Sequence, residues 1–258
     1  MNLSFYSAAV GASAQQTRLD IIANNISNVN TAGYKAKSPR FNDLLYANIR
    51  EPEENVSKIR QGSGAGIFST TTRMDRSSYD MTEGLYDYVI VGDGLFALQN
   101  PATEEIFYTR AGSFQLSQRA DGEFYLVAPK GELVLDPDFN PIMIPVNSYA
   151  EGETELVTTA EGEEVAVDNS ELNIGIFNFT NREGFLSVGA TMFSPVPKNG
   201  EPFLDEYATL QRGCVETSNV EIAQEMTDMI AAQRLYQINL RMVQTSDEIE
   251  GTINSLRG

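Results

Sequence analysis

The sequence predicts an α+β protein in which long N- and C-terminal helices pair as a coiled coil, with an extended connector and a mainly-β domain inserted between them. Three observations support this fold class. Apolar residues recur every three or four positions near both chain ends, as on one face of a helix. Short strand-like runs separated by turn residues fill the middle. Helical signals are confined to the ends, so the strands are expected to form a compact domain.

The first predicted element is a helix over residues 3–30, within an N-terminal segment 1–34. Small residues at its start permit a close helix neighbour but weaken an isolated helix. Gly33 can end the helix as a left-handed cap. A coiled-coil-like stripe follows at spacings of three and four: Leu19, Ile22, Ile26 and Val29. Periodicity alone also fits an ordinary amphipathic helix on a globular core.

Residues 35–83 are expected to form the extended connector. Pro39 and Pro52 flank a short apolar cluster, and a run rich in Gly, Ser and Thr follows over residues 62–72. This composition predicts few buried positions.

Residues 84–205 are expected to form the β domain. Tyr88 to Val91 is a predicted strand that ends in the turn Gly92-Asp93-Gly94. Asp121-Gly122 predicts a β-hairpin between Leu116 and residues 124–127. Residues 172–179 alternate between apolar and polar, as a half-buried strand does.

The C-terminal segment 206–258 carries the strongest periodic signal, a helix over residues 215–256 with Ser218 or Asn219 as its N-cap. About 40 residues at about 1.5 Å each would reach roughly 60 Å. That is too long for a helix packed only on a compact domain of this size, so the N-terminal helix is the expected partner. The apolar positions of the C-terminal helix are Ile222, Met226, Met229, Leu235, Ile238, Met242, Ile249, Ile253 and Leu256.

The composition excludes several classes of function. The net charge is -18, from 36 acidic against 18 basic residues, which argues against a nucleic-acid partner or an anionic membrane surface. Any polymer must therefore form through faces that are less charged than the average. The N-terminus lacks the features of a cleavable secretory signal, and no stretch approaches the roughly 18 apolar residues that span a bilayer.

Catalytic chemistry has weak support in the sequence. The chain has no histidine and one cysteine, Cys214, which excludes Ser-His and Cys-His nucleophile pairs, imidazole metal ligands and an internal disulfide. Acidic residues gather between Glu151 and Glu164 among Gly and Thr, which favours solvated loops over a pair of catalytic carboxylates. We predict no enzyme activity, catalytic site, cofactor, metal ion or small-molecule substrate. A carboxylate-dependent cell-wall hydrolase is the less favoured alternative.

Four asparagines lie within seven residues of the first helix: Asn24, Asn25, Asn28 and Asn30. Asparagine hydrogen-bonds readily to the backbone at caps and turns. On physical grounds alone the cluster fits a frayed helix end and a polar packing interface equally well.

Several motifs resemble those of flagellar rod and hook proteins, the axial family of the bacterial flagellum. Residues 22–35, IANNISNVNTAGYK, are similar to the N-terminal signature of that family. Residues 91–97 (VGDGLFA) and 108–114 (YTRAGSF) resemble its central β region. Residues 213–220 (GCVETSNV) and two later stretches, 225–230 and 233–239, are similar to the distal-rod branch, with a proximal-rod or hook-type subunit as the alternative.

The resemblance implies a structural subunit that polymerises into a hollow helical drive shaft, which transmits torque from motor to hook. Its partners would be copies of itself, other rod and hook proteins, and bushing-ring proteins. It would lie in the basal body, in the periplasm or cell-wall zone, after type III export without a cleaved signal peptide. The connector would brace neighbouring subunits, so deleting residues 55–72 should soften the rod and leave export intact.

The resemblance also assigns two assembly motifs, and it shifts the asparagine cluster towards a packing interface. The N-terminal motif comprises Ala23, Asn24, Asn25, Ile26, Asn28, Thr31, Gly33, Tyr34 and Lys35. The C-terminal motif comprises Val215, Glu216, Ser218, Asn219, Val220, Met226, Met229, Gln233, Arg234, Ile238, Asn239 and Met242.

Overall fold

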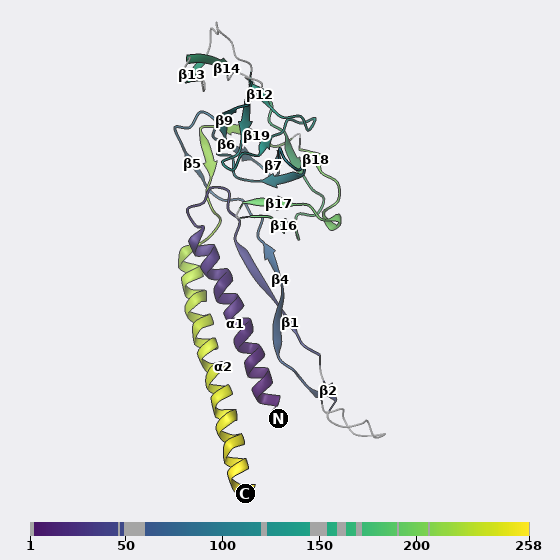
Figure 1. Cartoon of the computed structure of the whole chain (residues 1–258), viewed down its shortest axis with the longest axis vertical. Helices are drawn as coiled ribbons and strands as arrows, with labels where there is room; N and C mark the ends of the chain where they lie inside the picture. The colour runs from purple at the N-terminus through teal and green to yellow at the C-terminus, as the bar shows by residue number, and fades with distance from the viewer. Residues whose placement is uncertain are drawn as a thin grey trace. The chain divides into compact units, whose positions relative to one another are not determined.

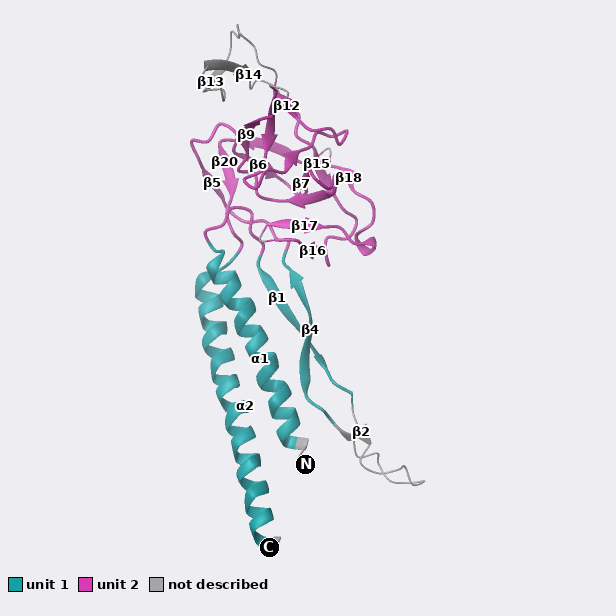
Figure 2. Ribbon diagram, in the orientation of Figure 1, with its two compact units in different colours: residues 1–29, 36–73, 220–258 teal, residues 30–35, 74–219 magenta. Residues whose placement is uncertain are grey.

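The chain forms two compact units. The computed structural model describes residues 3–45, 47–48, 60–119, 123–144, 154–158, 164–168, 172–189, 191–205 and 207–257 (Figure 1). Figure 2 colours the units separately. The helical unit comprises residues 1–29, 36–73 and 220–258, and the β unit comprises residues 30–35 and 74–219. Helices at the two ends and a mainly-β middle confirm the α+β class.

Two antiparallel helices run side by side in the helical unit, α1 (Leu3–Ser27) and α2 (Ile222–Arg257) (Figure 1). The Oγ atoms of Ser4 and Ser246 lie 3.4 Å apart. Seven residues further along α1, Gly11 faces Asn239, which lies seven residues back along α2. Fourteen residues further along each helix, Asn25 Nδ2 donates to Glu225 Oε1, so these three contacts are spaced by multiples of seven residues. Within the described residues, neither helix is long and apolar enough to cross a membrane.

The fully buried positions on the face of α2 that meets α1 are small or polar, and Met229, Tyr236 and Val243 beside them are half-buried. Glu225, Ala232 and Ser246 are buried on this face, and Ala8, Ala12 and Asn25 are buried on α1. Small side chains allow the two helices to approach closely. Gly11 shows how close they are, because an added Cβ would lie only 3.0 Å from Asn239 Nδ2.

Five apolar residues in the later part of α2 form a separate face, here called the apolar stripe, and most of that face is exposed. We expected the apolar positions of α2 to pack on the N-terminal helix, and for most of them this expectation is wrong; Met229 is half-buried. Adjacent helix residues point about 100° apart, so Ile238 points away from the contact that Asn239 makes. The stripe consists of Leu235, Ile238, Met242, Ile249 and Leu256, which are 43%, 54%, 49%, 50% and 82% exposed.

The connector contains an antiparallel ribbon of β1 (Lys37–Asp43) and β4 (Ala65–Thr72). The register shifts between Arg40 and Phe41, as at a β-bulge. Two further short strands also pair, β2 (Ala47–Asn48) with β3 (Arg60–Gln61). A deletion of residues 55–72 would therefore remove β4 and leave β1 without its partner, so it would not test the connector alone.

The β unit is built around a ten-stranded sheet. Its central path runs β12-β10-β11-β7-β8-β17-β16, with β9 beside β10, and β15 joined to β7 and β18. Apolar side chains from both the sheet and its connections form the core, among them Phe96, Leu98, Leu126 and Val134. The strands of this sheet are β7 (Leu95–Gln99), β8 (Ile106–Thr109), β9 (Gln115–Gln118), β10 (Phe124–Val127), β11 (Leu133–Val134), β12 (Met143–Ile144), β15 (Ile176–Asn178), β16 (Leu186–Ser187), β17 (Met192–Ser194) and β18 (Phe203–Leu204).

Three smaller pairs complete the β unit. β5 (Tyr79–Met81) pairs with β20 (Cys214–Glu216), and β6 (Tyr88–Val91) pairs with β19 (Thr209–Arg212). β13 (Thr154–Thr158) pairs with β14 (Glu164–Asp168). A 3-10 turn, η1, spans Pro197–Asn199.

Several predicted strands are confirmed. The strand over 88–91 is β6, and β9 and β10 pair antiparallel as the hairpin prediction requires. The hairpin turn itself, residues 121 and 122, lies outside the described residues. The strand expected over 172–179 is shorter, because only residues 176–178 pair with neighbours. Of the acidic residues between 151 and 164, Glu151, Glu153, Glu161 and Glu163 lie outside the described residues.

The predicted start of the C-terminal helix is wrong. Residues 214–216 form β20 rather than helix, because their backbone pairs with β5 and alternate residues of the strand are buried. The helix begins at Ile222, and Glu225 N donates to Glu221 O at 3.0 Å. Ser218 and Asn219 are therefore not N-caps.

The predicted end of the N-terminal helix is also corrected. α1 ends at Ser27, and the backbone N–H of Asn28 is shared between the carbonyls of Asn24 and Asn25 at 3.2 Å each. Gly33 has the expected positive φ of 69°. It lies six residues beyond the helix, so it forms a turn of the β unit and is not the helix cap.

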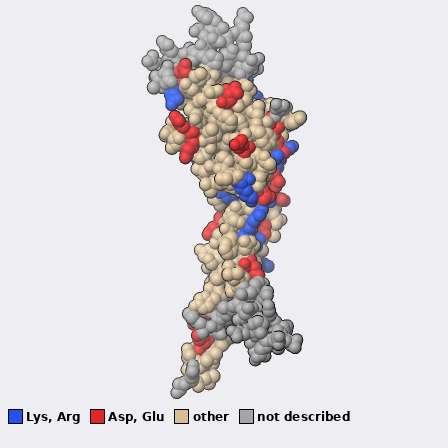
Figure 3. Space-filling model, turned by 90° about the vertical axis from the view of Figure 1, so that its right-hand side faces the viewer, with Lys and Arg blue, Asp and Glu red and all other residues tan. Residues whose placement is uncertain are grey.

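Charged residues are dispersed on the face drawn in Figure 3. Acidic side chains lie there in small separate groups, with uncharged surface between them. An acidic chain thus retains surface on which like-charge repulsion is locally weak.

Candidate functional site

A buried charge cluster in the β unit joins Lys35, Arg110 and Glu216, one residue from each of three motifs far apart in the sequence. The side chains of Lys35, Arg110 and Glu216 are 2%, 5% and 0% exposed. Lys35 Nζ donates to Glu216 Oε1 at 2.7 Å, and Arg110 Nε donates to Glu216 Oε2. Both carboxylate oxygens of Glu216 are therefore engaged by cations.

Neutral groups complete the cluster. The guanidinium of Arg110 donates to the carbonyls of Gly94, Ile90 (2.9 Å) and Gly92 (2.6 Å). Lys35 Nζ also donates to Asp75 O at 2.6 Å. Ionic groups this deeply buried are tolerated only when their hydrogen-bonding capacity is met.

Burial changes the pKa of Lys35. Desolvation lowers the pKa of its ammonium group, because the charged form has lost water, while the charge and hydrogen bond of Glu216 oppose that shift. With its three members held by one another and by carbonyls, the cluster is suited to fixing chain segments together.

The strands around the cluster are held by further hydrogen bonds. Gly33 N donates to Glu216 O at 2.7 Å, and Ser77 N donates to Glu216 Oε1 at 3.0 Å. Ser77 Oγ donates to Ser218 O at 2.8 Å, and Asn219 Nδ2 donates to Asp75 O at 3.4 Å. The segments after α1, after β4 and before α2 are thus bonded to one another within the β unit.

Two glycines permit the close approach of these segments. At Gly33, an added Cβ would lie 2.3 Å from the backbone N of Ala111, next to Arg110. At Gly112, it would lie 1.7 Å from Tyr88 O. Both motifs therefore need glycine for backbone contact.

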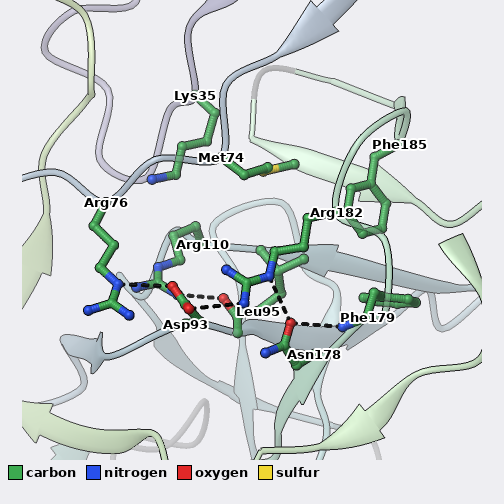
Figure 4. Close-up of a pocket in the computed structure, with 11 residues that line it drawn as sticks. Lys35, Met74, Arg76, Asp93, Leu95, Arg110, Asn178, Phe179, Arg182 and Phe185 are labelled. Carbon is green, nitrogen blue, oxygen red and sulfur yellow. Dashed lines mark hydrogen bonds and ion pairs between the residues drawn. The ribbon is translucent and has the colours of Figure 1, made fainter.

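A second group of charges borders the cluster (Figure 4). Arg76 and Arg182 approach Asp93 from two sides, each with a 2.9 Å hydrogen bond to one of its oxygens. The hydrogen bond from Arg76, followed by that from Arg182, holds the pKa of the Asp93 carboxyl well below its usual value. The hollow beside them measures about 20 Å³, which suits a water-sized group.

In the helical unit, Asn25 connects α1 to two other elements. Its Nδ2 donates to Lys37 O at 2.9 Å and to Glu225 Oε1 at 3.2 Å, and its Oδ1 accepts from Lys37 N at 2.9 Å. Asn28 instead bonds back to Asn24 O through Nδ2 at 2.9 Å. The asparagine cluster therefore serves both a packing contact and a helix end.

The N-terminal motif is divided between the two units. Gly33, Tyr34 and Lys35 are buried in the β unit, with Tyr34 fully inaccessible. Ala23, Asn24, Asn25, Ile26 and Asn28 belong to the helical unit, where Asn25 is buried and Ala23 and Asn24 are exposed; Thr31 is half-buried in the β unit.

The C-terminal motif is divided in the same way. Val215 and Glu216 lie on β20, and Ser218 and Asn219 follow it. Val220 is buried just before α2. The remaining residues lie on α2, where Met229 and Asn239 are half-buried and Met226, Gln233, Arg234, Ile238 and Met242 are exposed.

Sequence reasoning missed six residues of these sites: Arg76, Ser77, Asp93, Arg110, Arg182 and Glu225. An available signal for Arg110 was a cation directly after the apolar strand β8 and two residues before a glycine. Ser77 and Glu225 carried no local signal, because their roles depend on partners at least 139 residues away.

Comparison with known proteins gives consistent matches along the chain. Residues 5–35 match the family of flagella basal body rod proteins, residues 89–176 match the D1 domain of the flagellar hook protein FlgE/F/G family, and residues 211–256 match the C-terminal family of flagellar basal body rod FlgEFG proteins. Lys35, Arg110 and Glu216 each lie within one of these three matches. The matches define the class as flagellar axial proteins.

Full-length relatives narrow the class. The flagellar basal-body rod protein FlgG of Borreliella burgdorferi is 32% identical over 100% of this chain and 99% of its own length. FlgG of Buchnera aphidicola subsp. Schizaphis graminum is 32% identical over 98% and 99%, and FlgG of Agrobacterium fabrum is 33% identical over 96% of each. The chain belongs to the FlgG family of flagellar basal-body rod proteins and is a structural subunit of the flagellar rod.

Proposed function

We propose that copies of this chain polymerise into a hollow helical rod that transmits torque from the flagellar motor to the hook, and that the apolar stripe of α2 carries the contact between copies. The role is structural, without catalysis or cofactor. The observation that carries the proposal is the exposure of the stripe: five apolar side chains on one helix face are at least 43% exposed.

Burial of the stripe would favour association. Fully burying a Leu, Ile or Met side chain contributes about 1.5–3 kcal/mol, so covering side chains that are half-exposed contributes about half of that each. The side chains of the stripe carry no charge. Arg234 and Arg241 directly precede Leu235 and Met242, and Glu248 and Glu250 flank Ile249. Charges of both signs thus border the stripe, although the chain as a whole has a net charge of -18.

We further propose that α1 and α2 pair as an antiparallel coiled coil. The seven-residue steps of their contacts support this pairing, because a seven-residue repeat keeps one seam of each helix facing its partner. The helices within 1–34 and 206–258 would form the inner core, the domain 84–205 the outer layer, and the connector 35–83 a brace between subunits.

The charge cluster would stiffen the β unit where its chain segments begin and end. Lys35 is the last residue of the β unit before β1, and Glu216 lies shortly before the segment that precedes α2. Buried ion pairs and backbone hydrogen bonds resist local opening, so these segments would stay fixed to one another within the β unit under load. Under this proposal the two assembly motifs act through the stripe, through the helix contact at Asn25 and through the cluster.

The test places one acidic residue on the stripe. Ile238→Asp should abolish rod assembly in cells that lack the chromosomal copy, while the purified subunit keeps its helix content. Gln237→Asp adds the same charge at an exposed position off the stripe and should assemble. Basal bodies are counted by electron microscopy. Assembly of Ile238→Asp, or equal failure of both variants, would contradict the proposal.

The subunit would be exported by the type III route with its N-terminus uncleaved, and would contact other rod and hook proteins and the bushing ring. The central match names FlgE, FlgF and FlgG together, so a proximal-rod or hook position is the second candidate. Labelling the subunit in isolated basal bodies distinguishes these positions, and its intact mass reports whether a leader was removed.

A further inference from the structure

A second cavity lies in the β unit, apart from the charge cluster. Its volume is about 240 Å³. A cavity of ~150 Å³ already holds a benzene molecule, so this one has room for an aromatic ring. Apolar side chains such as Leu98 and Met192 line it together with Thr31, Lys130 and Glu132.

One carboxylate oxygen of Glu132, Oε2, is buried and has no hydrogen-bond partner among the described residues. Buried polar atoms are rarely left unpaired, because the lost hydration costs free energy. An occupant that brings both an apolar ring and a hydrogen-bond donor would satisfy the cavity and the carboxylate together.

Tyr207 has both properties and the greatest exposure. Its side chain is 96% exposed, the highest value among the large apolar and aromatic residues described. The other side chains exposed by more than 80% are Leu45, Met81 and Leu256, which carry no donor. We propose that Tyr207 of one copy inserts into this cavity of a second copy, with its hydroxyl donating to Glu132 Oε2.

The proposed contact joins two different sets of residues, because Tyr207 is not among the residues that line the cavity. A heterologous contact forms a closed ring when the rotation between copies closes and an open helical array when it does not, and a rod requires the open case. The inference rests on the proposed self-assembly and adds a contact between β units to the one proposed for α2. Tyr207 and the cavity both belong to the β unit, so the contact is independent of the helices.

Photo-crosslinking in assembled rods tests the contact. With p-benzoylphenylalanine in place of Tyr207, illumination should link one copy to the peptide of another that contains residues 128–132 or 191–192. The same photo-reactive residue in place of Met242 is the matched control for the α2 contact. Links at 242 without links from 207 to the cavity would overturn this inference and leave the proposed function standing. If neither position forms links between copies, both this inference and the proposed function would be overturned.

A double-mutant cycle tests the hydrogen bond without a bulky probe. Tyr207→Phe keeps the ring and removes the donor, so the subunit recovered in isolated basal bodies should fall about tenfold. In a Glu132→Leu background, which removes the carboxylate, Tyr207→Phe should have no further effect. Equal losses in both backgrounds would show that the hydroxyl acts elsewhere and would overturn the assignment. Glu132→Leu alone should unfold as cooperatively as the parent chain.

Discussion

Lys35 Nζ and Glu216 Oε1 lie 2.7 Å apart in the interior of the β unit, although 181 positions separate the two residues in the chain. Their side chains are 2% and 0% exposed. The pair brings the segment that follows α1 against the segment that precedes α2, and Arg110 closes it from the third side. Lys35, near the start of the β unit in sequence, and Glu216, near its end, are thus both joined to its interior.

Loss of the carboxylate at this pair should destabilise the β unit strongly. Glu216→Gln leaves two buried cations without a counter-charge, and breaking a buried ion pair costs about 3–5 kcal/mol. The free energy of unfolding in urea measures the effect. Glu221→Gln removes the same charge at an exposed position and should change stability by less than about 0.5 kcal/mol. Equal stability of the two variants would show that the cluster does not hold the unit together.

Gly33→Ala should be more harmful than its size suggests. Both Gly33 and Gly131 have positive φ, 69° and 94°, so alanine costs about 1–2 kcal/mol at either position for its conformation alone. A Cβ at Gly33 also meets Ala111 N at 2.3 Å, whereas a Cβ at Gly131 meets nothing within 4 Å. Thermal unfolding should therefore show a larger loss for Gly33→Ala than for Gly131→Ala. Matching losses would mean that the close approach to Ala111 is unimportant.

Asn25 should matter more than its neighbour Asn24. Asn25→Ala removes three hydrogen bonds that tie α1 to β1 and α2, and leaving buried partners unpaired costs about 1–3 kcal/mol. Asn24 is exposed, so Asn24→Ala should be nearly neutral. Far-ultraviolet circular dichroism during urea unfolding follows the helices directly. Greater loss of helix stability from Asn24→Ala would refute this view of the cluster.

Asp93 should make stability depend on acid. Its pKa is lowered from the ordinary value of 3.8, so the stabilisation is fully present above that value and is lost as pH falls through the folded-state pKa. Asp93→Asn should therefore lower stability at pH 7, and the difference from the parent should shrink below pH ~4. Because the carboxyl is 32% exposed, the effect should be smaller than that of Glu216→Gln. A constant difference across this range would exclude the carboxyl as its source.

Local patterns predicted the elements whose structure depends on near neighbours. The strand at 88–91 and the pairing of β9 with β10 follow from alternation and turn residues within a few positions. The two terminal helices follow from their periodicity. Helix ends were less predictable, because β20 replaces the expected helix start through pairing with β5, more than 130 residues earlier.

The charge cluster and the true helix contact could not be read from local patterns. Lys35 and Glu216 look like ordinary surface charges until their segments meet, since burial is set by the fold and not by the neighbouring sequence. In α2 the apolar positions gave the clearer repeat. However, α1 packs on a different face of α2, the one that contains Ala232 and Asn239. Hydrophobic periodicity identifies a face that needs cover, and it does not identify what covers it.

Electron cryomicroscopy of isolated rods, at a resolution that shows side chains, would reveal the contact between copies directly. We expect Ile238 and Met242 to be buried against a second copy, while Gly11 and Asn239 remain in contact within one chain. A rod in which Ile238 and Met242 face solvent, or pack only on α1 of the same chain, would contradict the proposed contact.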